Sequence, residues 1–201
     1  MNIKNHLSNI ALQSGLSPDT LQFPDCDIDP AKITIALISE VPPADPDDGF
    51  YSKAESSDYM KTTLGLFAAA GVSVGSIQDI LNLGIYITTA VKSPKSGYTV
   101  DTAVIKAHLP LLQAELALFP NLKVIGLMGD VAKKAVNMIA KARTKKNIIP
   151  SESTYKIRNN EYYLGEVRVF PSYIITGKNL LIEKGKCDTI ADDIRRMVEV
   201  M

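Results

Sequence analysis

Short apolar runs rich in branched side chains recur along the chain and predict the strands of a parallel sheet. Each run stops at a polar or glycine-containing segment, as a buried strand entering a loop does. The three longest runs cover residues 32–38, 84–91 and 122–128. Two shorter runs, residues 162–164 and 167–170, are separated by Gly165 and Glu166 and are typical of a hairpin. The second arm of this hairpin is expected to supply a fourth central strand.

Between these runs, apolar residues recur at helical spacing. The predicted helices cover residues 58–70, 76–81, 101–119 and 131–142, and a last helix opens at Asp188. Asp101 and Asp130 are expected to cap their helices, and Pro110 either kinks its helix or starts a second one. Strands alternating with helices predict one α/β domain over residues 1–201, a three-layer α/β/α sandwich with a central four-stranded parallel sheet.

Ligands of such sheets bind in the loops beyond the carboxyl ends of the strands. These loops are expected at residues 39–51, 88–94, 129–133 and 170–180. No Gly-x-Gly-x-x-Gly follows a strand, residues 126–130 lack the Lys-Ser/Thr ending of a P-loop, and no Gly-x-Ser-x-Gly elbow occurs. The sequence therefore argues against a Rossmann dehydrogenase, a P-loop ATPase and the commonest α/β serine hydrolases.

The composition indicates an aliphatic core and argues against sites for structural metals. Of the 201 residues, 46% are hydrophobic and only 6% aromatic, which favours a folded domain over a disordered chain. Cys26 and Cys187 lie far apart without Cys or His partners at ligand spacing, so we expect neither structural zinc nor an all-cysteine iron-sulfur cluster. Asp45, Asp47 and Asp48 lack the spacing of a calcium loop. We expect no metal.

The first thirteen residues lack the basic and apolar regions of a signal peptide, and no run of 18 apolar residues occurs. We therefore expect a cytoplasmic protein without membrane contact. His6 and His108 lie in helical segments without a paired acid nearby in sequence, and we interpret both as structural.

A net charge of zero conceals two oppositely charged segments. Residues 1–60 carry three Lys against ten acids, whereas residues 131–170 carry nine basic residues against three acids. Clustered cations bind a phosphate backbone through counterion release. We interpret Lys133, Arg143, Lys145 and Lys146 as DNA-binding residues, and the alternative is a solvated helix face followed by a basic loop.

Five segments occur in an order that points to a family. They are Ile38-Ser39-Glu40-Val41-Pro42-Pro43, Asp47-Asp48-Gly49-Phe50-Tyr51, Tyr86-Ile87-Thr88-Thr89-Ala90-Val91-Lys92, residues 111–129 with Glu115 and Pro120, and Phe170-Pro171-Ser172. In this order the chain resembles the uracil-DNA glycosylase superfamily over about residues 33–180. It is most similar to the branch whose first motif reads Gly-Glu-Ala-Pro-Gly, without that branch's cluster cysteines.

The resemblance implies a fold, a reaction and a set of site residues. The fold is a four-stranded parallel sheet between helices, and the reaction is hydrolysis of the bond between a flipped base and its sugar. Glu40 would orient water or stabilise the sugar cation, and Phe50, or Tyr51 in its place, would stack on the base. Ser172 would contact a DNA phosphate. No metal or organic cofactor is implied.

This sequence departs from the family pattern at four positions. Thr89 stands where an Asn commonly reads the uracil edge, and a hydroxyl cannot reproduce an amide's paired donor and acceptor. Phe170 replaces the His of the closing motif, which removes an imidazole donor to the leaving base. Ser39 and Pro43 replace the two glycines of the first motif, which changes how closely the backbone approaches the sugar.

We therefore expect Glu40, Phe50, Thr89 and Phe170 to line one pocket, in a monomer that binds DNA. The expected function is slow or lost excision of uracil or another deaminated base. Two other classes stay open, a non-catalytic nucleic-acid-binding relative and a small-molecule-binding protein on the same fold. Individually, Glu40 is also compatible with a turn cap, and Phe50 and Phe170 with core packing.

Overall fold

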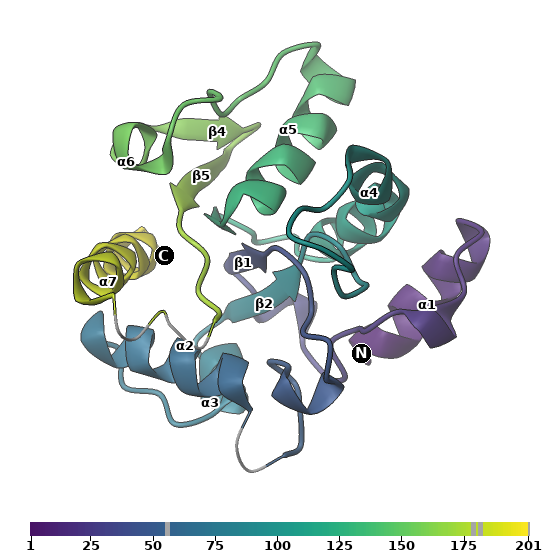
Figure 1. Cartoon of the computed structure of the whole chain (residues 1–201), viewed down its shortest axis with the longest axis horizontal. Coiled ribbons are helices and arrows are strands. Elements are labelled where there is room, and N and C mark those ends of the chain that lie inside the picture. The colour runs from purple at the N-terminus through teal and green to yellow at the C-terminus, as the bar shows by residue number, and fades with distance from the viewer. Residues whose placement is uncertain (55–56, 178–179, 181–182, 201) are drawn as a thin grey trace.

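The computed structural model describes residues 1–54, 57–177, 180 and 183–200. The described residues form a sheet with the strand order β2-β1-β3-β5-β4 (Figure 1). The strands are β1 (Ile35–Ser39), β2 (Ile85–Thr89), β3 (Val124–Met128), β4 (Tyr162–Leu164) and β5 (Val167–Ser172). Strands β2, β1, β3 and β5 are parallel, and β4 pairs antiparallel with β5.

The prediction of four parallel strands is thus confirmed, but the prediction of a four-stranded sheet is wrong. The first arm of the hairpin also joins the sheet and adds β4 as a fifth strand at the edge. Gly165 lies in the turn with a φ of +65°, a conformation that glycine adopts without strain, so the two arms can pair closely.

The helices follow the predicted alternation with strands. They are α1 (Ile3–Gln13), α2 (Asp58–Ala69), α3 (Ile77–Asn82), α4 (Thr102–Ala117), α5 (Asp130–Thr144), α6 (Thr154–Ile157) and α7 (Lys184–Glu199). Pro110 neither ends α4 nor starts a second helix, because the buried side chains of Ile105 before it and of Leu111 and Leu112 after it hold the helix against the core. Two predicted starts are wrong: Gly129, not Asp130, occupies the N-cap of α5, and α7 begins at Lys184, before Asp188.

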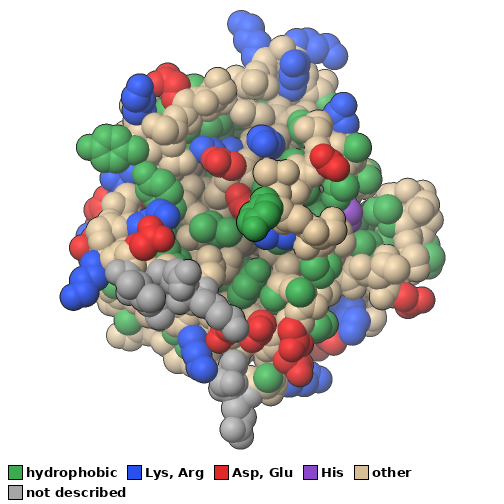
Figure 2. Space-filling model, in the orientation of Figure 1, with side chains coloured by type: hydrophobic (Ala, Val, Ile, Leu, Met, Phe, Trp, Pro, Cys, Tyr) green, Lys and Arg blue, Asp and Glu red, His purple; other side chains and the backbone are tan. Residues whose placement is uncertain are grey.

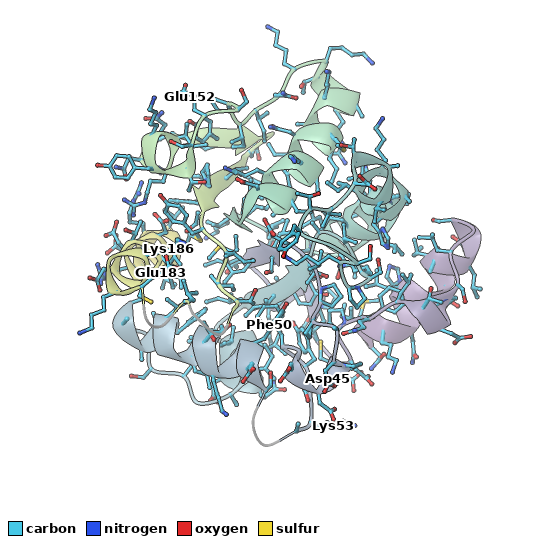
Figure 3. All side chains as sticks on the ribbon, viewed as in Figure 1. Asp45, Phe50, Lys53, Glu152, Glu183 and Lys186 are labelled. Atoms are coloured by element: carbon cyan, nitrogen blue, oxygen red, sulfur yellow. The ribbon has the colours of Figure 1, made fainter. Side chains whose placement is uncertain are left out.

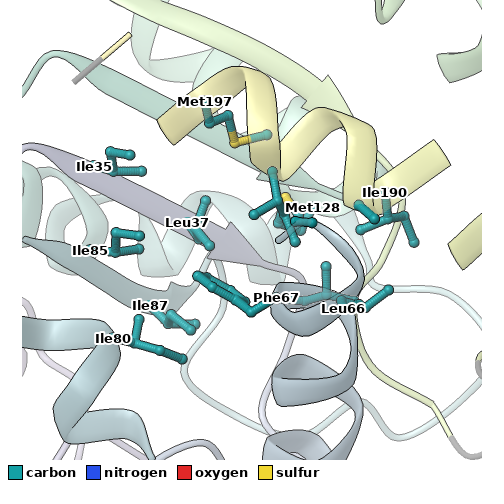
Figure 4. Packing of buried hydrophobic residues seen from close by; sticks show 14 of the residues in the cluster. Ile35, Leu37, Leu66, Phe67, Ile80, Ile85, Ile87, Met128, Ile190 and Met197 are labelled. Atoms are coloured by element: carbon teal, nitrogen blue, oxygen red, sulfur yellow. The ribbon is translucent and has the colours of Figure 1, made fainter. Parts of the chain in front are cut away.

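The two faces of the sheet are covered by different helices (Figure 1). On one face, Ile35, Leu37 and Ile87 pack against α2, α3 and α7 (Figure 4). On the other face, Ala36, Ile38 and Leu127 pack against α4 and α5. This alternation along β1 is the two-residue period of a strand buried on both sides.

Gly126 allows α7 to lie close to the sheet. A Cβ atom at this position would stand 2.7 Å from the side chain of Leu37 and 2.8 Å from the sulfur of Met197. Both distances are below any ordinary contact, so a larger residue would push α7 outward. Among the described helices, none is long and apolar enough to cross a membrane.

A fully buried ion pair ties α4 to the carboxyl end of β2. Glu115 of α4 accepts hydrogen bonds from Tyr86 and Thr88, each at 2.7 Å, and pairs with the ammonium of Lys92. The Lys92 ammonium also donates to the Thr88 hydroxyl at 2.6 Å and to the Thr89 carbonyl at 2.7 Å. Burial lowers the pKa of Lys92, although Glu115 opposes this shift. Every proton of the ammonium thus has an acceptor.

We expect Glu115→Gln to lower the free energy of unfolding by about 3–5 kcal/mol, because it leaves the buried Lys92 charge without its counterion. Replacing both partners, Lys92→Met with Glu115→Gln, should cost less than Glu115→Gln alone, since the amide oxygen still accepts from Tyr86 and Thr88. Urea denaturation measures both effects. A double variant that is no more stable than Glu115→Gln would contradict this account.

The exposed pair between Lys4 and Asp25 supplies the control. Both side chains are about half exposed, so Asp25→Asn should cost less than about 1 kcal/mol in the same measurement.

Candidate functional site

A large basic cleft lies beside α5, at the carboxyl edge of the sheet. It encloses about 1240 Å³ and is bounded by α4, α5, residues 147 and 150–154, and residues 172–174 after β5. Its lysines are Lys106, Lys133, Lys134, Lys141 and Lys145, and its acids are Glu40, Asp130 and Glu152. The cleft therefore carries an excess of positive charge, which suits a polyanion such as a phosphate backbone.

Helical spacing brings most of these lysines together. Lys134, Lys141 and Lys145 follow one another at intervals of seven and four residues, so they lie on one side of α5 and of the residue that caps it. Lys106 faces the same cleft from α4. Figure 2 shows Lys and Arg side chains gathered at the end of the molecule where α5 ends.

Glu40 lines the basic cleft and follows β1 immediately in the chain. Its Oε1 atom accepts a hydrogen bond of 3.1 Å from the backbone N–H of Val131, in the first turn of α5. The positive end of the helix dipole stabilises a carboxylate in this place. Gly129 makes the approach possible, because its φ is +120° and a Cβ atom there would stand 2.5 Å from Oε1.

Lys133 is held inside the cleft by two side chains. Its ammonium pairs with Asp130 at 2.6 Å and donates to the Thr154 hydroxyl at 2.8 Å. With 9% of its surface exposed, Lys133 has little freedom to move. An ammonium fixed in this way keeps one further proton to donate to an anion in the cleft.

A smaller aromatic hollow lies at the carboxyl end of β2. It encloses about 480 Å³ and is lined by Phe23, Phe50 and Tyr51, by four prolines, and by Thr88 and Thr89 at the end of β2. Figure 3 shows Phe50 and Lys53, both in its wall, on the side of α2, whereas Glu152 of the basic cleft lies toward α6. The lining also includes Lys4, Asp25, Asp47 and Lys53, so the hollow combines aromatic and proline walls with polar groups, which suits a small polar ring.

The aromatic side chains of this hollow are held in place by their neighbours. Phe50 packs edge-to-face on Tyr59, with ring centroids 5.1 Å apart. The Tyr51 hydroxyl donates to the carbonyl of Ile87 at 2.8 Å. Burial raises the pKa of Tyr59, and burial raises the pKa of Cys26, beside Tyr51, to about 12. Both groups are neutral at physiological pH.

One short segment contributes to both the basic cleft and the aromatic hollow. Glu40 stands in the wall of the basic cleft, and Pro42 and Pro43 stand in the wall of the aromatic hollow. The expectation of one pocket is therefore wrong: Glu40 lines the cleft, Phe50 and Thr89 line the hollow, and Phe170 lines neither. One residue, Val41, separates Glu40 from Pro42 in the wall of the hollow.

Phe170 is a core residue. It pairs with Gly126 inside the sheet, is 2% exposed and packs with the residues beneath α7. The guanidinium groups of Arg168 and Arg196 lie 4.7 and 5.6 Å from its ring centroid. A ring enclosed in this way cannot reach a ligand at the carboxyl edge of the sheet.

Ser172 reaches the basic cleft, but its hydroxyl is already used. Its Oγ atom donates to Asp193 of α7 at 2.6 Å, and Arg158 pairs with the same carboxylate at 2.7 Å. Burial raises the pKa of Asp193, although Arg158 and Ser172 oppose this shift. This network fixes the loop after β5, so Ser172 contributes to the cleft through its position rather than through a free hydroxyl.

The remaining DNA-binding candidates divide between the cleft and open surface. Lys133 and Lys145 line the cleft, whereas Arg143 and Lys146 are exposed outside its wall. The sequence interpretation included Lys134 and Lys141 in the basic segment without naming them as DNA-binding residues, and it missed Lys106. Helical spacing on α5 could have identified Lys134 and Lys141, but Lys106 comes from another helix and depends on how α4 packs. Within the described part of the chain, no group of three potential metal ligands occurs.

We expect Gly129→Ala to lower the free energy of unfolding by about 1–3 kcal/mol and to displace Glu40, because the added Cβ meets its carboxylate and the positive φ is strained. Thermal denaturation and the amide resonance of Val131 report the two effects. Gly177→Ala is the matched control, with a φ of +126° and no neighbour within 4 Å among the residues that the structure describes. An unmoved Val131 resonance in Gly129→Ala would refute the contact.

Searches of protein families and of curated proteins find no match to this chain. The resemblance to DNA glycosylases rests on the order of its motifs, and a function must be argued from the site itself.

Proposed function

We propose that this protein binds DNA along the basic cleft and hydrolyses the N-glycosidic bond of uracil or another deaminated base. One observation carries the proposal: Glu40 lines the lysine-lined cleft, and Pro42 and Pro43, two and three residues further along the chain, line the aromatic hollow. A nucleotide bound there would place its phosphates by the lysines, its sugar by Glu40 and its base by Phe50.

A carboxylate is the group that this chemistry requires at the sugar. In base excision the bond between C1′ and the base nitrogen breaks, the base leaves as an anion, and the sugar becomes cation-like. Water then bonds to C1′ and releases a proton, which neutralises the leaving base. Glu40 uses Oε1 on the N–H of Val131, which leaves Oε2 to orient the water or stabilise the cation.

The same site explains why the reaction should be slow. A preorganised donor to an oxyanion contributes on the order of 100 to 1000-fold in rate, and Phe170, in place of the family's His, lies in the core. The hydroxyl of Thr89 offers one contact to the base edge, which gives weaker selection between bases than an amide does.

A single-turnover assay on uracil-containing DNA tests the reaction, with Glu40→Gln as the variant. The amide keeps an oxygen for the Val131 N–H, so the fold should persist while base release falls at least about 100-fold. Circular dichroism checks the fold. Activity untouched by Glu40→Gln would remove Glu40 from the mechanism, and fast release by the unchanged protein would refute the expected slow rate.

Phe170→His serves as a second variant in this assay. Because Phe170 lies under α7, we expect lower stability and no gain in rate. A faster reaction would show that position 170 reaches the base. DNA binding without any base release would favour the non-catalytic relative over the enzyme.

Salt dependence tests the basic cleft. Replacing Lys141 and Lys145 with Ala should weaken binding to unrelated DNA sequences about equally and reduce the slope of log K against log salt by roughly one to two. Replacing Lys32 and Lys123 is the matched control, because both lysines are exposed at the opposite, amino-terminal edge of the sheet. If the two double variants have the same slope of log K against log salt, the cleft lysines contribute no more to DNA binding than other exposed lysines do.

A further inference from the structure

A buried hydroxyl without a partner lies at the last position of β1. Ser39 is fully buried, and its Oγ atom has no hydrogen-bond partner among the described residues. Leaving such a group unpaired costs about 1–3 kcal/mol, and alanine would fit the same space without that cost. Folding alone therefore gives no reason for a serine at this position.

The register of the sheet places a second hydroxyl beside it. Ser39 pairs with Thr89 of β2, and neighbouring strands lie about 4.8 Å apart. Side chains alternate along β1, so Ser39 lies on the same face as Ile35 and Leu37, and Thr89 lies on the same face as Ile87. The two hydroxyls are therefore neighbours across the strands at the carboxyl edge.

The β2 side of this edge borders the aromatic hollow, and Ser39 lies beside it, outside the lining of the hollow. Thr89 lines the hollow, and Phe50 belongs both to its wall and to the apolar cluster on the face that carries Ser39. The Tyr59 ring, which packs on Phe50, lies in the same cluster. The only polar side chains that the strands themselves bring to this face of the β1–β2 pair, at its carboxyl end, are the hydroxyls of Ser39 and Thr89.

We propose that Ser39 is a specificity-determining residue, which reads the polar edge of the base together with Thr89. This inference rests on the proposed function, since it names the group that selects the base in the same site. Each hydroxyl can donate one hydrogen bond and accept others, and it rotates to suit its partner. Two adjacent hydroxyls can therefore meet a base edge that presents one donor and one acceptor, as the amide of the family pattern does.

Rotation of the hydroxyls also predicts broad selectivity. An amide presents its donor and acceptor in fixed places, whereas two hydroxyls can exchange these roles. The pair should accept both uracil and hypoxanthine, whose edges each carry a carbonyl beside an N–H. Because Ser39 is fully buried, the base reaches it only when the side chains of the hollow move apart.

Two DNA probes separate reading of the base from a structural role. One carries 2′-fluoro-2′-deoxyuridine, whose glycosidic bond resists hydrolysis, and the other carries a tetrahydrofuran abasic analogue at the same position. We expect Ser39→Ala to weaken binding of the uracil probe about fivefold and to leave binding of the abasic probe unchanged. The melting temperature of Ser39→Ala should equal or exceed that of the unchanged protein.

Thr62→Val is the control, because Thr62 is also buried but its hydroxyl already donates to the backbone of Asp58. It should leave both affinities unchanged. Equal weakening of both probes by Ser39→Ala, or no change in either, would overturn the proposal. So would an unchanged protein that binds the uracil probe no better than the abasic probe.

These outcomes are distinct from failure of the proposed enzyme. A Ser39-dependent preference for the uracil probe without any base release would refute the glycosylase and support base reading by Ser39. If the protein releases base from uracil-containing DNA and Ser39→Ala leaves this release unchanged, the glycosylase is supported and base reading by Ser39 is refuted.

Discussion

The buried ion pair between Lys92 and Glu115 fixes the part of the sheet on which both hollows depend. Two charges without water are stable only when their hydrogen bonds are complete, and here the ammonium has three acceptors and the carboxylate three donors. Because Thr88 and the carbonyl of Thr89 belong to this network, the end of β2 has one position relative to α4. As a result, Thr89 lines the aromatic hollow. The exposed side of α4, which carries Lys106, lies beside the basic cleft.

Glu40 is a negative charge in a cleft whose other features attract anions. Its carboxylate would repel a phosphate, so a site built only to bind phosphate would exclude it. The first turn of α5 offsets this cost, because the backbone N–H of Val131 and the helix dipole stabilise the charge. A fixed carboxylate among lysines suits a ligand that carries negative charge along its backbone and develops positive charge at one point, as a nucleotide does when its base leaves.

Sequence patterns were sufficient for the layers of the fold but not for the composition of the site. The runs that became β1, β2 and β3 are apolar on both faces, and such runs admit few arrangements other than a covered parallel sheet. The same apolar pattern could not predict that Phe170 is a core residue. Whether an aromatic side chain at the end of an apolar run faces a ligand or the core depends on α7, and Met197 reaches the sheet only because position 126 is glycine. The division into two hollows likewise depends on the path of residues 40–43.

The departures from the glycosylase pattern are consistent with one another once they are placed in the structure. A histidine at position 170 would lie between two guanidinium groups, where its protonated form would be repelled, and phenylalanine instead accepts both cations on its ring faces. The glycosylase pattern that the sequence resembles has an asparagine at the position of Thr89 and a glycine at the position of Ser39, and these two positions pair across β1 and β2. A shorter side chain on β2 thus coincides with a longer one on β1, and a hydroxyl on each strand takes the place of one amide. The two hydroxyls put polar groups at this edge, although alanine at position 39 would avoid the cost of a buried hydroxyl without a partner.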